Sequence, residues 1–274
     1  MRVVLPEILT RPPSPADARV AYGSQPSQFG DLFLPAGHGP HPLVIYLHGG
    51  FWRAAFGLDH ASHVCRAIAA EGWACWSLEY RRIGEPGGGW PGTLEDVGQG
   101  ADFAGELAGR YPLDRDRVLA MGHSAGGHLA LWLAARRRLA PDSPLAVPQP
   151  LRPAAVVSLA GVGDLRRAAE LGLSSSVVEE LLGGPPAAVP ERYATASPRE
   201  LLPLGVPQTL VHGTADDRVP YALSLAYAEA AQQAGDTVDL VTLPDVDHFA
   251  LIDPLSDAWP TVLAAARRSI ERVR

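Results

Sequence analysis

The sequence contains no lysine and no asparagine, so all 23 of its basic residues are arginine. Without lysine, the protein cannot use a Schiff-base lysine, a lysine-dependent phosphate-binding loop or a serine–lysine dyad. Without asparagine, a catalytic asparagine is excluded as well. A GC-rich genome and selection against thermolabile asparagine at high temperature both produce such a composition, and we favour the genomic explanation.

Cysteine is also scarce, since only Cys65 and Cys75 occur, both in apolar stretches. We expect them to be buried free thiols. Their spacing does not match a zinc ribbon, and the pair His60 and His63 lacks a carboxylate pattern that would complete a metal site. The sequence therefore predicts no metal site and no cofactor.

Long apolar runs are missing too. Residues 1–31 are rich in proline and polar residues, so the sequence has no signal-peptide core there, and no segment is long enough to span a bilayer. The formal net charge is −7, and no basic run is interleaved with aromatic residues, which argues against a nucleic-acid partner. We expect a cytoplasmic protein that acts on a small molecule without nucleic-acid or membrane partners; a homodimer is compatible with the sequence.

What the sequence does contain is a regular alternation of two kinds of segment. Short apolar runs predict strands at 31–34, 43–47, 74–79, 118–121, 155–159, 209–212 and 238–243. Helical patterns lie between or after them at 59–71, 94–110, 125–138, 220–234 and 256–272. This order predicts a single α/β domain over 1–274, with a mostly parallel sheet covered by helices on both faces.

Two segments do not follow this alternation. Residues 1–30 form an N-terminal arm ahead of the first predicted strand. Residues 161–207 are irregular and rich in Gly, Pro, Ser and Ala, with a short helical pattern at 177–182. We interpret 161–207 as a small cap or lid inserted after a strand; the alternative is a long connection with no role in substrate choice.

The predicted strand at 118–121 runs into Gly122-His123-Ser124-Ala125-Gly126, and a helical pattern follows at once. G-x-S-x-G between a strand and a helix is typical of a nucleophile elbow, where the serine sits on a strained turn and is exposed to substrate. The small Gly122 and Gly126 leave room for neighbouring backbone at such a turn. Ser124 is therefore the candidate nucleophile.

The predicted strand at 43–47 ends in His48-Gly49-Gly50-Phe51-Trp52. Acyl transfer needs hydrogen-bond donors for the developing oxyanion, and backbone amides in a glycine loop can supply them. We predict an oxyanion hole from the amides of Gly50, Phe51 and Ala125. A plain tight turn is the alternative for this loop.

Polar loops also follow two later strands. Asp216 and Asp217 come after the strand at 209–212, and His248 comes after the strand at 238–243. A carboxylate that orients the imidazole and an imidazole that takes the serine proton would complete a catalytic triad. Asp217 is the rival for the acid, with a solvated loop charge or a helix N-cap as its alternative role.

With these motifs the chain resembles the α/β-hydrolases, in which nucleophile, acid and histidine follow in the order Ser, Asp, His. It is most similar to esterases with an H-G-G-x oxyanion motif, and the H-G-G-F-W and G-H-S-A-G motifs also resemble the arylformamidase-like (kynurenine formamidase-like) group. The resemblance implies an α/β-hydrolase fold with about eight strands and a small cap. It places the acid at Asp216, through the G-x-x-D-x-x-V-P pattern that begins at Gly213. Phe51 departs from both groups, which have a third glycine or usually a tyrosine there.

The expected function is a serine carboxylesterase that cleaves esters of small acyl or aryl substrates through an acyl-enzyme. An arylformamidase or amidase with the same triad is the first alternative, and a non-catalytic binding protein on the same fold is the second. Apolar walls suit such substrates, and we predict Trp52, Trp90 and Phe249 as pocket residues. For Trp52 and Trp90, filling space beneath the loops is an equally good interpretation.

Overall fold

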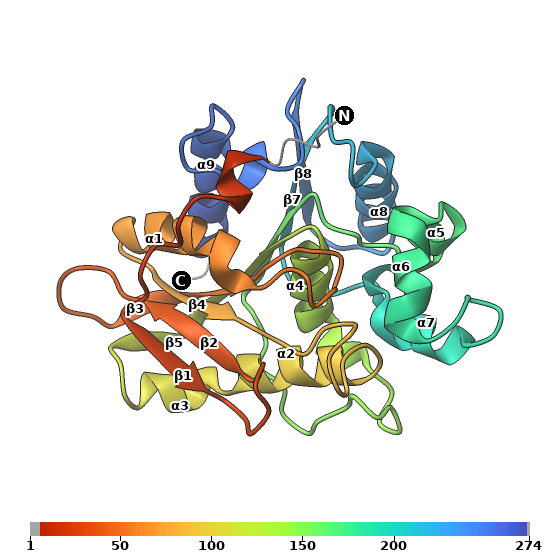
Figure 1. Cartoon of the computed structure of the whole chain (residues 1–274), viewed down its shortest axis with the longest axis horizontal. Coiled ribbons are helices and arrows are strands. Elements are labelled where there is room, and N and C mark those ends of the chain that lie inside the picture. Colours follow the sequence, from red (N-terminus) through yellow and green to blue (C-terminus); the bar gives the residue numbers. More distant parts are fainter. Residues whose placement is uncertain (1–5, 273–274) are drawn as a thin grey trace.

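The computed structural model describes residues 6–272, which form one α/β body built on a single sheet (Figure 1). The strands are β1 (Ala18–Ala21), β2 (Phe29–Phe33), β3 (His41–Leu47), β4 (Ala74–Leu78), β5 (Leu113–His123), β6 (Ala155–Leu159), β7 (Gln208–Gly213) and β8 (Val238–Leu243). The helices are α1 (Ser62–Ala70), α2 (Gly92–Asp102), α3 (Ala104–Ala108), α4 (Ala125–Ala135), α5 (Leu165–Glu170), α6 (Leu173–Leu182), α7 (Pro190–Ala196), α8 (Tyr221–Gln233) and α9 (Trp259–Glu271).

The strand order in the sheet is β1-β2-β4-β3-β5-β6-β7-β8. The pairs β1/β2 and β2/β4 are antiparallel, and all the other neighbours are parallel. The carboxyl ends of the parallel strands therefore meet at one edge of the sheet, where ligands bind in open α/β folds. The loops after β3, β5, β7 and β8 carry the candidate catalytic residues.

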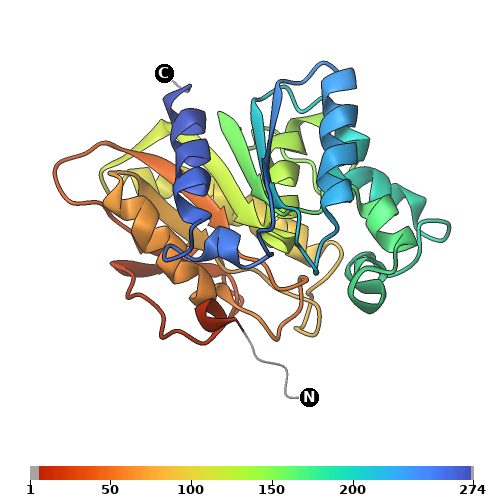
Figure 2. The same cartoon turned by 90° about the horizontal axis from the view of Figure 1, so that it is seen from above.

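Helices cover both faces of the sheet, as Figure 2 shows from above. The residues of β3 are all buried and alternate between two cores: Leu43, Ile45 and Leu47 pack on one side, Val44 and Tyr46 on the other. The first core includes residues of α2, α3, α4 and α8, and the second includes residues of α1 and α9. A strand buried on both faces has to be apolar throughout, which is why the run at 43–47 shows no polar alternation.

Helix α4 is buried along its whole length, from Ala125 to Ala135. A helix that is apolar all round needs cover on every side. The sheet covers one side, and the segment 161–207, which folds into α5, α6 and α7, lies next to α4 on another (Figure 1). The segment is thus helical and packed, whereas its role as a mobile lid stays a prediction.

The structure differs from the sequence predictions at several element boundaries. The arm 1–30 contains strand β1, a four-residue edge strand with alternating half-buried and exposed residues, which is too short to give a clear pattern; its first five residues lie outside the described part. The single helix predicted over 94–110 is two helices that meet at Phe103. The helix at 125–138 ends at Ala135, and a 3₁₀ turn follows at Arg136–Arg138.

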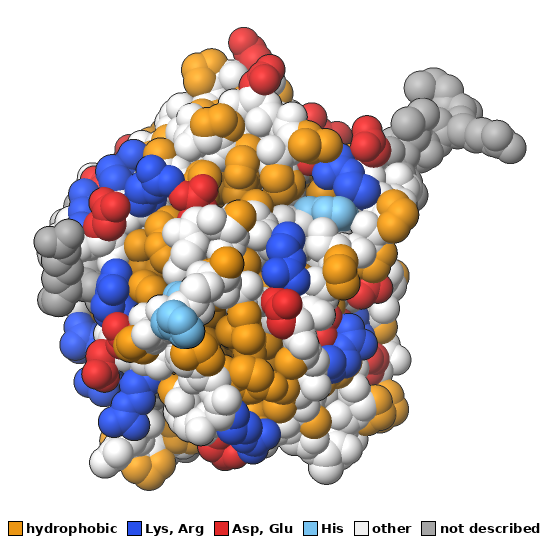
Figure 3. All heavy atoms as spheres, turned by 90° about the vertical axis from the view of Figure 1, so that its left-hand side faces the viewer, with side chains coloured by type: hydrophobic (Ala, Val, Ile, Leu, Met, Phe, Trp, Pro, Cys, Tyr) orange, Lys and Arg blue, Asp and Glu red, His pale blue; other side chains and the backbone are white. Residues whose placement is uncertain are grey.

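The surface carries charges of both signs. On the face seen in Figure 3, arginine side chains are interspersed with aspartate and glutamate side chains. Neither sign dominates this face, so it does not create the single-sign field that steers nucleic acids. Among residues 6–272, no helix is both long enough and apolar enough to cross a membrane.

Candidate active site

Ser124 lies at the sharp turn between β5 and α4. Its backbone has φ 57° and ψ −119°, a conformation that a residue with a side chain rarely adopts. The turn is crowded: a Cβ on Gly122 would lie 2.2 Å from the carbonyl oxygen of Gly126, and a Cβ on Gly126 would lie 1.9 Å from that of Leu47. Both glycines are therefore sterically required, which explains the G-x-S-x-G spacing around a strained serine.

Ser124 opens into a small cavity. The cavity holds about 40 Å³ and is lined by Leu9, Gly50, Phe51, Phe56, His60, His123, Ser124, Arg218, His248 and Phe249. The chain thus brings together the candidate nucleophile, the candidate histidine and part of the predicted oxyanion loop, from three different strand ends. Phe249, which the sequence analysis proposes as a pocket residue, is among the residues that line this cavity.

His248 and Asp216 form a close pair beneath this cavity. The Nδ1 atom of His248 lies 2.6 Å from Oδ2 of Asp216, and both side chains are buried. Because Asp216 occupies Nδ1, the free Nε2 is the nitrogen available to a serine hydroxyl. Asp217, the rival acid, is 71% exposed and pairs with Arg218 instead.

Asp216 is held in its ionised form by several donors. Its Oδ1 accepts hydrogen bonds from the backbone amides of Arg218 and Val219, each at 2.8 Å. Burial raises the pKa of Asp216, but hydrogen bonds from His212 and His248 outweigh this effect, and the net pKa lies well below its usual range. The carboxylate therefore stays charged at neutral pH, as an orienting group for His248 must.

His212, at the end of β7, is a site residue that the sequence analysis did not identify. Its Nε2 lies 3.1 Å from Oδ2 of Asp216 and 3.0 Å from the carbonyl oxygen of Val219. A carbonyl can only accept, so Nε2 carries a proton and donates, while Nδ1 faces the Ser224 hydroxyl at 2.7 Å. His212 thus positions Asp216, and its place four residues before the acid was the one available signal.

The predicted oxyanion loop has backbone amides without acceptors. Within residues 6–272, the amides of Gly50, Phe51 and Ala125 donate to no backbone or side-chain oxygen. Buried or half-buried amides are normally paired, so three unpaired donors beside the candidate nucleophile are a ready site for negative charge. The structure places all three at the ends of β3 and β5, next to Ser124.

This loop is strained and is held by an interior hydrogen bond. Gly50, Phe51 and Trp52 have φ values of 116°, 53° and 55°. The indole nitrogen of Trp52 donates to Nδ1 of His128 at 3.2 Å, and Nε2 of His128 lies 2.9 Å from the carbonyl of Ala196. His128 is therefore the neutral Nε2–H tautomer, and burial lowers its pKa to about 4.

Two of the predicted pocket residues lie elsewhere. Trp52 is 1% exposed and belongs to the core, because its indole has to reach His128 below the loop. Trp90 packs against the same core and does not line the cavity. For both residues the structure favours the alternative interpretation, in which the ring fills space beneath loops.

A second buried network supports the loop from below. His48 stacks on Tyr80 with ring centroids 4.5 Å apart, and its Nε2 lies 2.8 Å from Oε1 of Glu79. The other Glu79 oxygen accepts from Arg82 and from the Leu58 amide. Burial raises the pKa of Glu79, but His48 and Arg82 outweigh it and leave the pKa below its usual value.

His123 is the neighbour of Ser124 and contacts His248. Its Nε2 donates to the carbonyl oxygen of His248 at 3.0 Å, and the two rings lie 4.4 Å apart. Burial lowers the pKa of His123 well below its ordinary value, so it is neutral. His123 therefore fixes the backbone of the His248 loop.

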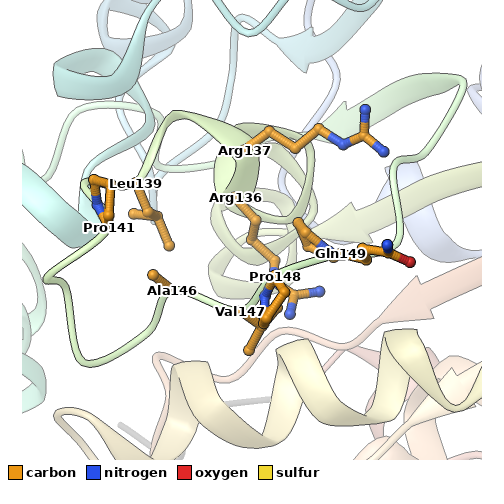
Figure 4. Close-up of a pocket in the computed structure, with 9 residues that line it drawn as sticks. Arg136, Arg137, Leu139, Pro141, Ala146, Val147, Pro148 and Gln149 are labelled. Carbon is orange, nitrogen blue, oxygen red and sulfur yellow. The ribbon is translucent and has the colours of Figure 1, made fainter.

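A much larger cavity lies elsewhere in the described chain. It holds about 720 Å³ and lies between the end of α4 and the segment 139–150, as Figure 4 shows. Its lining includes Arg136 and Arg137 but no carboxylate, imidazole, thiol or hydroxyl side chain. Arg136 is engaged by Asp102 at 2.7 Å. The cavity therefore lacks the groups that acid–base or nucleophilic chemistry requires.

Other chemistry-bearing groups contribute nothing to the site. Both cysteines are free and buried, which confirms that prediction. Among residues 6–272, no cluster of three or more His, Cys, Asp or Glu side chains has the geometry of a metal site.

Comparison with known proteins identifies the family. A profile of the BD-FAE family matches residues 31–230. The chain belongs to the BD-FAE family. It is also similar to a probable isoprenylcysteine alpha-carbonyl methylesterase of Oryza sativa subsp. japonica, with 29% identity over 86% of this chain and 59% of that protein. Carboxylesterase NlhH of Mycobacterium tuberculosis is 28% identical over 84% of this chain and 74% of its own length.

Solved structures confirm the fold. Esterase B from Lactobacillus rhamnosis superimposes with a TM-score of 0.80 at 22% identity, over 97% of this chain and 91% of that one. A carbohydrate esterase from gut microbiota gives a TM-score of 0.78 at 20% identity, over 94% of this chain and 99% of that one. The predicted α/β-hydrolase fold is thus confirmed. The chain spans about 60% of the length of the first curated relatives.

Proposed function

We propose that this member of the BD-FAE family is a serine carboxylesterase that acts on small acyl esters. The observation that carries the proposal is the convergence of three parts on one cavity: the strained Ser124, the His248–Asp216 pair, and the unpaired amides of the 48–52 loop. The named relatives and structural neighbours are esterases, which supports the same activity.

In the proposed mechanism, His248 removes the hydroxyl proton of Ser124 as the oxygen attacks the ester carbonyl. The amides of Gly50, Phe51 and Ala125 stabilise the oxyanion. His248 then protonates the leaving alcohol, and water, activated by the same imidazole, releases the acid from the acyl-enzyme. Asp216 keeps the imidazole in the required tautomer throughout.

The size of the cavity supports a small acyl group. One water needs roughly 10 to 15 Å³ of such space, so about 40 Å³ corresponds to about three waters. An acyl group of two or three carbons fills a space of this order. The rest of the substrate would then lie outside, towards the mouth of the cavity.

Covalent labelling tests the proposal. A fluorophosphonate probe should label the wild-type protein, and Ser124→Ala should abolish labelling and lower kcat/KM for 4-nitrophenyl acetate by about 10⁴-fold or more. A folded wild-type protein that neither reacts with the probe nor turns over esters would instead indicate a binding protein on this fold.

An arylformamidase would use the same residues, and the finer assignment to that group rests on the H-G-G-F-W and G-H-S-A-G motifs. Turnover of N-formylkynurenine by the unlabelled wild-type enzyme, compared with its turnover of 4-nitrophenyl acetate, separates the two activities. A higher kcat/KM for the formamide would make the arylformamidase the main activity.

A further inference from the structure

The mouth of the candidate active site carries one positive charge. Among the described residues that line the cavity, Arg218 is the one arginine, and none is a carboxylate. Burial lowers the pKa of His60 to about 4, and His123 is neutral as well. During turnover, the negative charge of Asp216 balances the positive charge that His248 acquires with the serine proton. Arg218 is therefore the cationic side chain that an incoming substrate meets at this cavity.

The backbone of Arg218 is fixed by the catalytic machinery. Its amide donates to Oδ1 of Asp216 at 2.8 Å, and the next amide, of Val219, donates to the same oxygen. The side chain therefore starts from a rigid point, two residues after the acid. A guanidinium that is anchored in this way loses less conformational freedom when it binds a ligand.

The guanidinium of Arg218 forms one exposed ion pair, through Nε. Its Nε lies 3.2 Å from Oδ1 of Asp217, and the two side chains are 44% and 71% exposed. Within residues 6–272, the terminal nitrogens of Arg218 contact no acceptor. An exposed ion pair of this kind is weak, because water and salt screen the two charges. The two terminal nitrogens remain available for a planar anion, which arginine binds through two parallel hydrogen bonds.

The remainder of the mouth is apolar and aromatic. Phe51, Phe56 and Phe249 line the cavity with Arg218, and Phe56 is 39% exposed. A cavity of about 40 Å³ suits a small acyl group, and the larger part of a substrate would then lie along this mouth. An aromatic ring with a charged substituent matches both its apolar surface and its cation.

We propose that the enzyme prefers small acyl esters whose outer part bears a carboxylate, and that Arg218 binds this carboxylate. The inference rests on the proposed esterase function and adds a substrate class to it. Arg218 is then a specificity-determining residue, and Asp217 acts as a competing internal anion that weakens the preference.

Two esters with the same acyl group test the proposal: 4-acetoxybenzoate, which is anionic, and 4-acetoxybenzamide, which is neutral. The measured quantity is the ratio of kcat/KM for 4-acetoxybenzoate to kcat/KM for 4-acetoxybenzamide. Arg218→Gln should lower this ratio about three- to tenfold, mainly through KM for the anionic ester, because a ground-state contact is lost. Asp217→Asn should raise the ratio about two- to threefold, since it frees the guanidinium.

Arg167→Gln is the matched control. Arg167 is an exposed arginine paired with Glu170 on α5, so the ratio should stay at the wild-type value. Raising the salt concentration from 0.05 to 0.5 M should lower the wild-type ratio and leave the ratio of Arg218→Gln nearly constant. Turnover of both esters with a ratio that neither variant shifts would overturn the inference, whereas turnover of neither ester by folded protein would overturn the esterase function itself.

Discussion

Four groups from different parts of the chain form hydrogen bonds with the Asp216 carboxylate. Its neighbour Asp217 has one exposed ion pair, with Arg218. Oδ2 accepts hydrogen bonds from His248 and His212, and Oδ1 accepts hydrogen bonds from two backbone amides of the following turn. This difference arises because Asp216 points into the protein from the end of β7, while Asp217 points out. The sequence could not show this directly, since two adjacent aspartates in a loop have the same local pattern.

The distinction leads to a prediction for the two aspartates. Asp216→Asn should lower kcat for 4-nitrophenyl acetate by about 10³- to 10⁴-fold, because an amide supports the wrong imidazole tautomer. Asp217→Asn should stay within about threefold of wild type on this neutral ester. Steady-state kinetics with circular dichroism as a folding check decides the matter, and a larger loss for Asp217→Asn would assign the acid to that residue.

At the scale of single elements, the loop after β3 depends on a contact with α4. Phe51 and Trp52 both have positive φ, a conformation that costs of the order of 1 to 3 kcal/mol for each such residue. The Trp52 indole binds His128, which in turn binds the carbonyl of Ala196. The loop with the predicted oxyanion donors is therefore tied to the segment 161–207 through one buried imidazole.

This tie predicts a specific effect of Trp52→Phe. The variant keeps an aromatic ring but loses the indole N–H, so the loop should relax and the amides of Gly50 and Phe51 should lose alignment. We expect kcat to fall by about ten- to a hundredfold, with little change in KM. Deletion of one oxyanion donor typically costs about a hundred- to a thousandfold in kcat, so this loss is smaller or at most similar.

Trp132→Phe is the matched control for this experiment. Trp132 is also 1% exposed, and its indole nitrogen donates to the carbonyl of Thr195 at 3.0 Å, away from the oxyanion loop. Both variants should lose similar stability in urea unfolding, but only Trp52→Phe should lose kcat. Equal losses of kcat in the two variants would mean that the Trp52 contact is merely structural.

For the molecule as a whole, the sequence was informative where patterns are local. The seven predicted strands are all present. The run at 43–47 is the clearest of them, because β3 is buried on both faces of the sheet and is therefore apolar throughout. The G-x-S-x-G turn was recognisable because steric crowding at Gly122 and Gly126 leaves no other residue. The loop after β3 was recognisable through its glycines and its position after a strand.

The sequence was uninformative where the outcome depends on distant partners. β1 forms only because β2 offers it an edge, and its four residues have no strong pattern of their own. Trp52 was expected in the pocket, but His128, 76 positions away, draws it inwards. His60 lines the candidate site from a turn after the loop at 48–52, and no local motif marks it.

Several imidazoles in this protein are buried without a carboxylate, and this makes stability depend on pH. Burial lowers the pKa of His128 to about 4, whereas a histidine in the unfolded chain titrates near 6.5. Between these two values the unfolded chain binds more protons than the folded one. Stability therefore falls as the pH drops through this window, by about 1.4 kcal/mol per pH unit for one such group.

His128→Gln should remove this contribution. We expect the free energy of unfolding of the wild type to decrease between pH 7 and pH 5, and His128 should account for about 2 kcal/mol of this decrease. In His128→Gln the decrease should therefore be about 2 kcal/mol smaller. The depressed pKa of Asp216 does not interfere, because its stabilisation is lost only below about pH 4. Urea unfolding at both pH values measures the difference; equal falls in wild type and variant would show that His128 is protonated in the folded state and that its assigned tautomer is wrong.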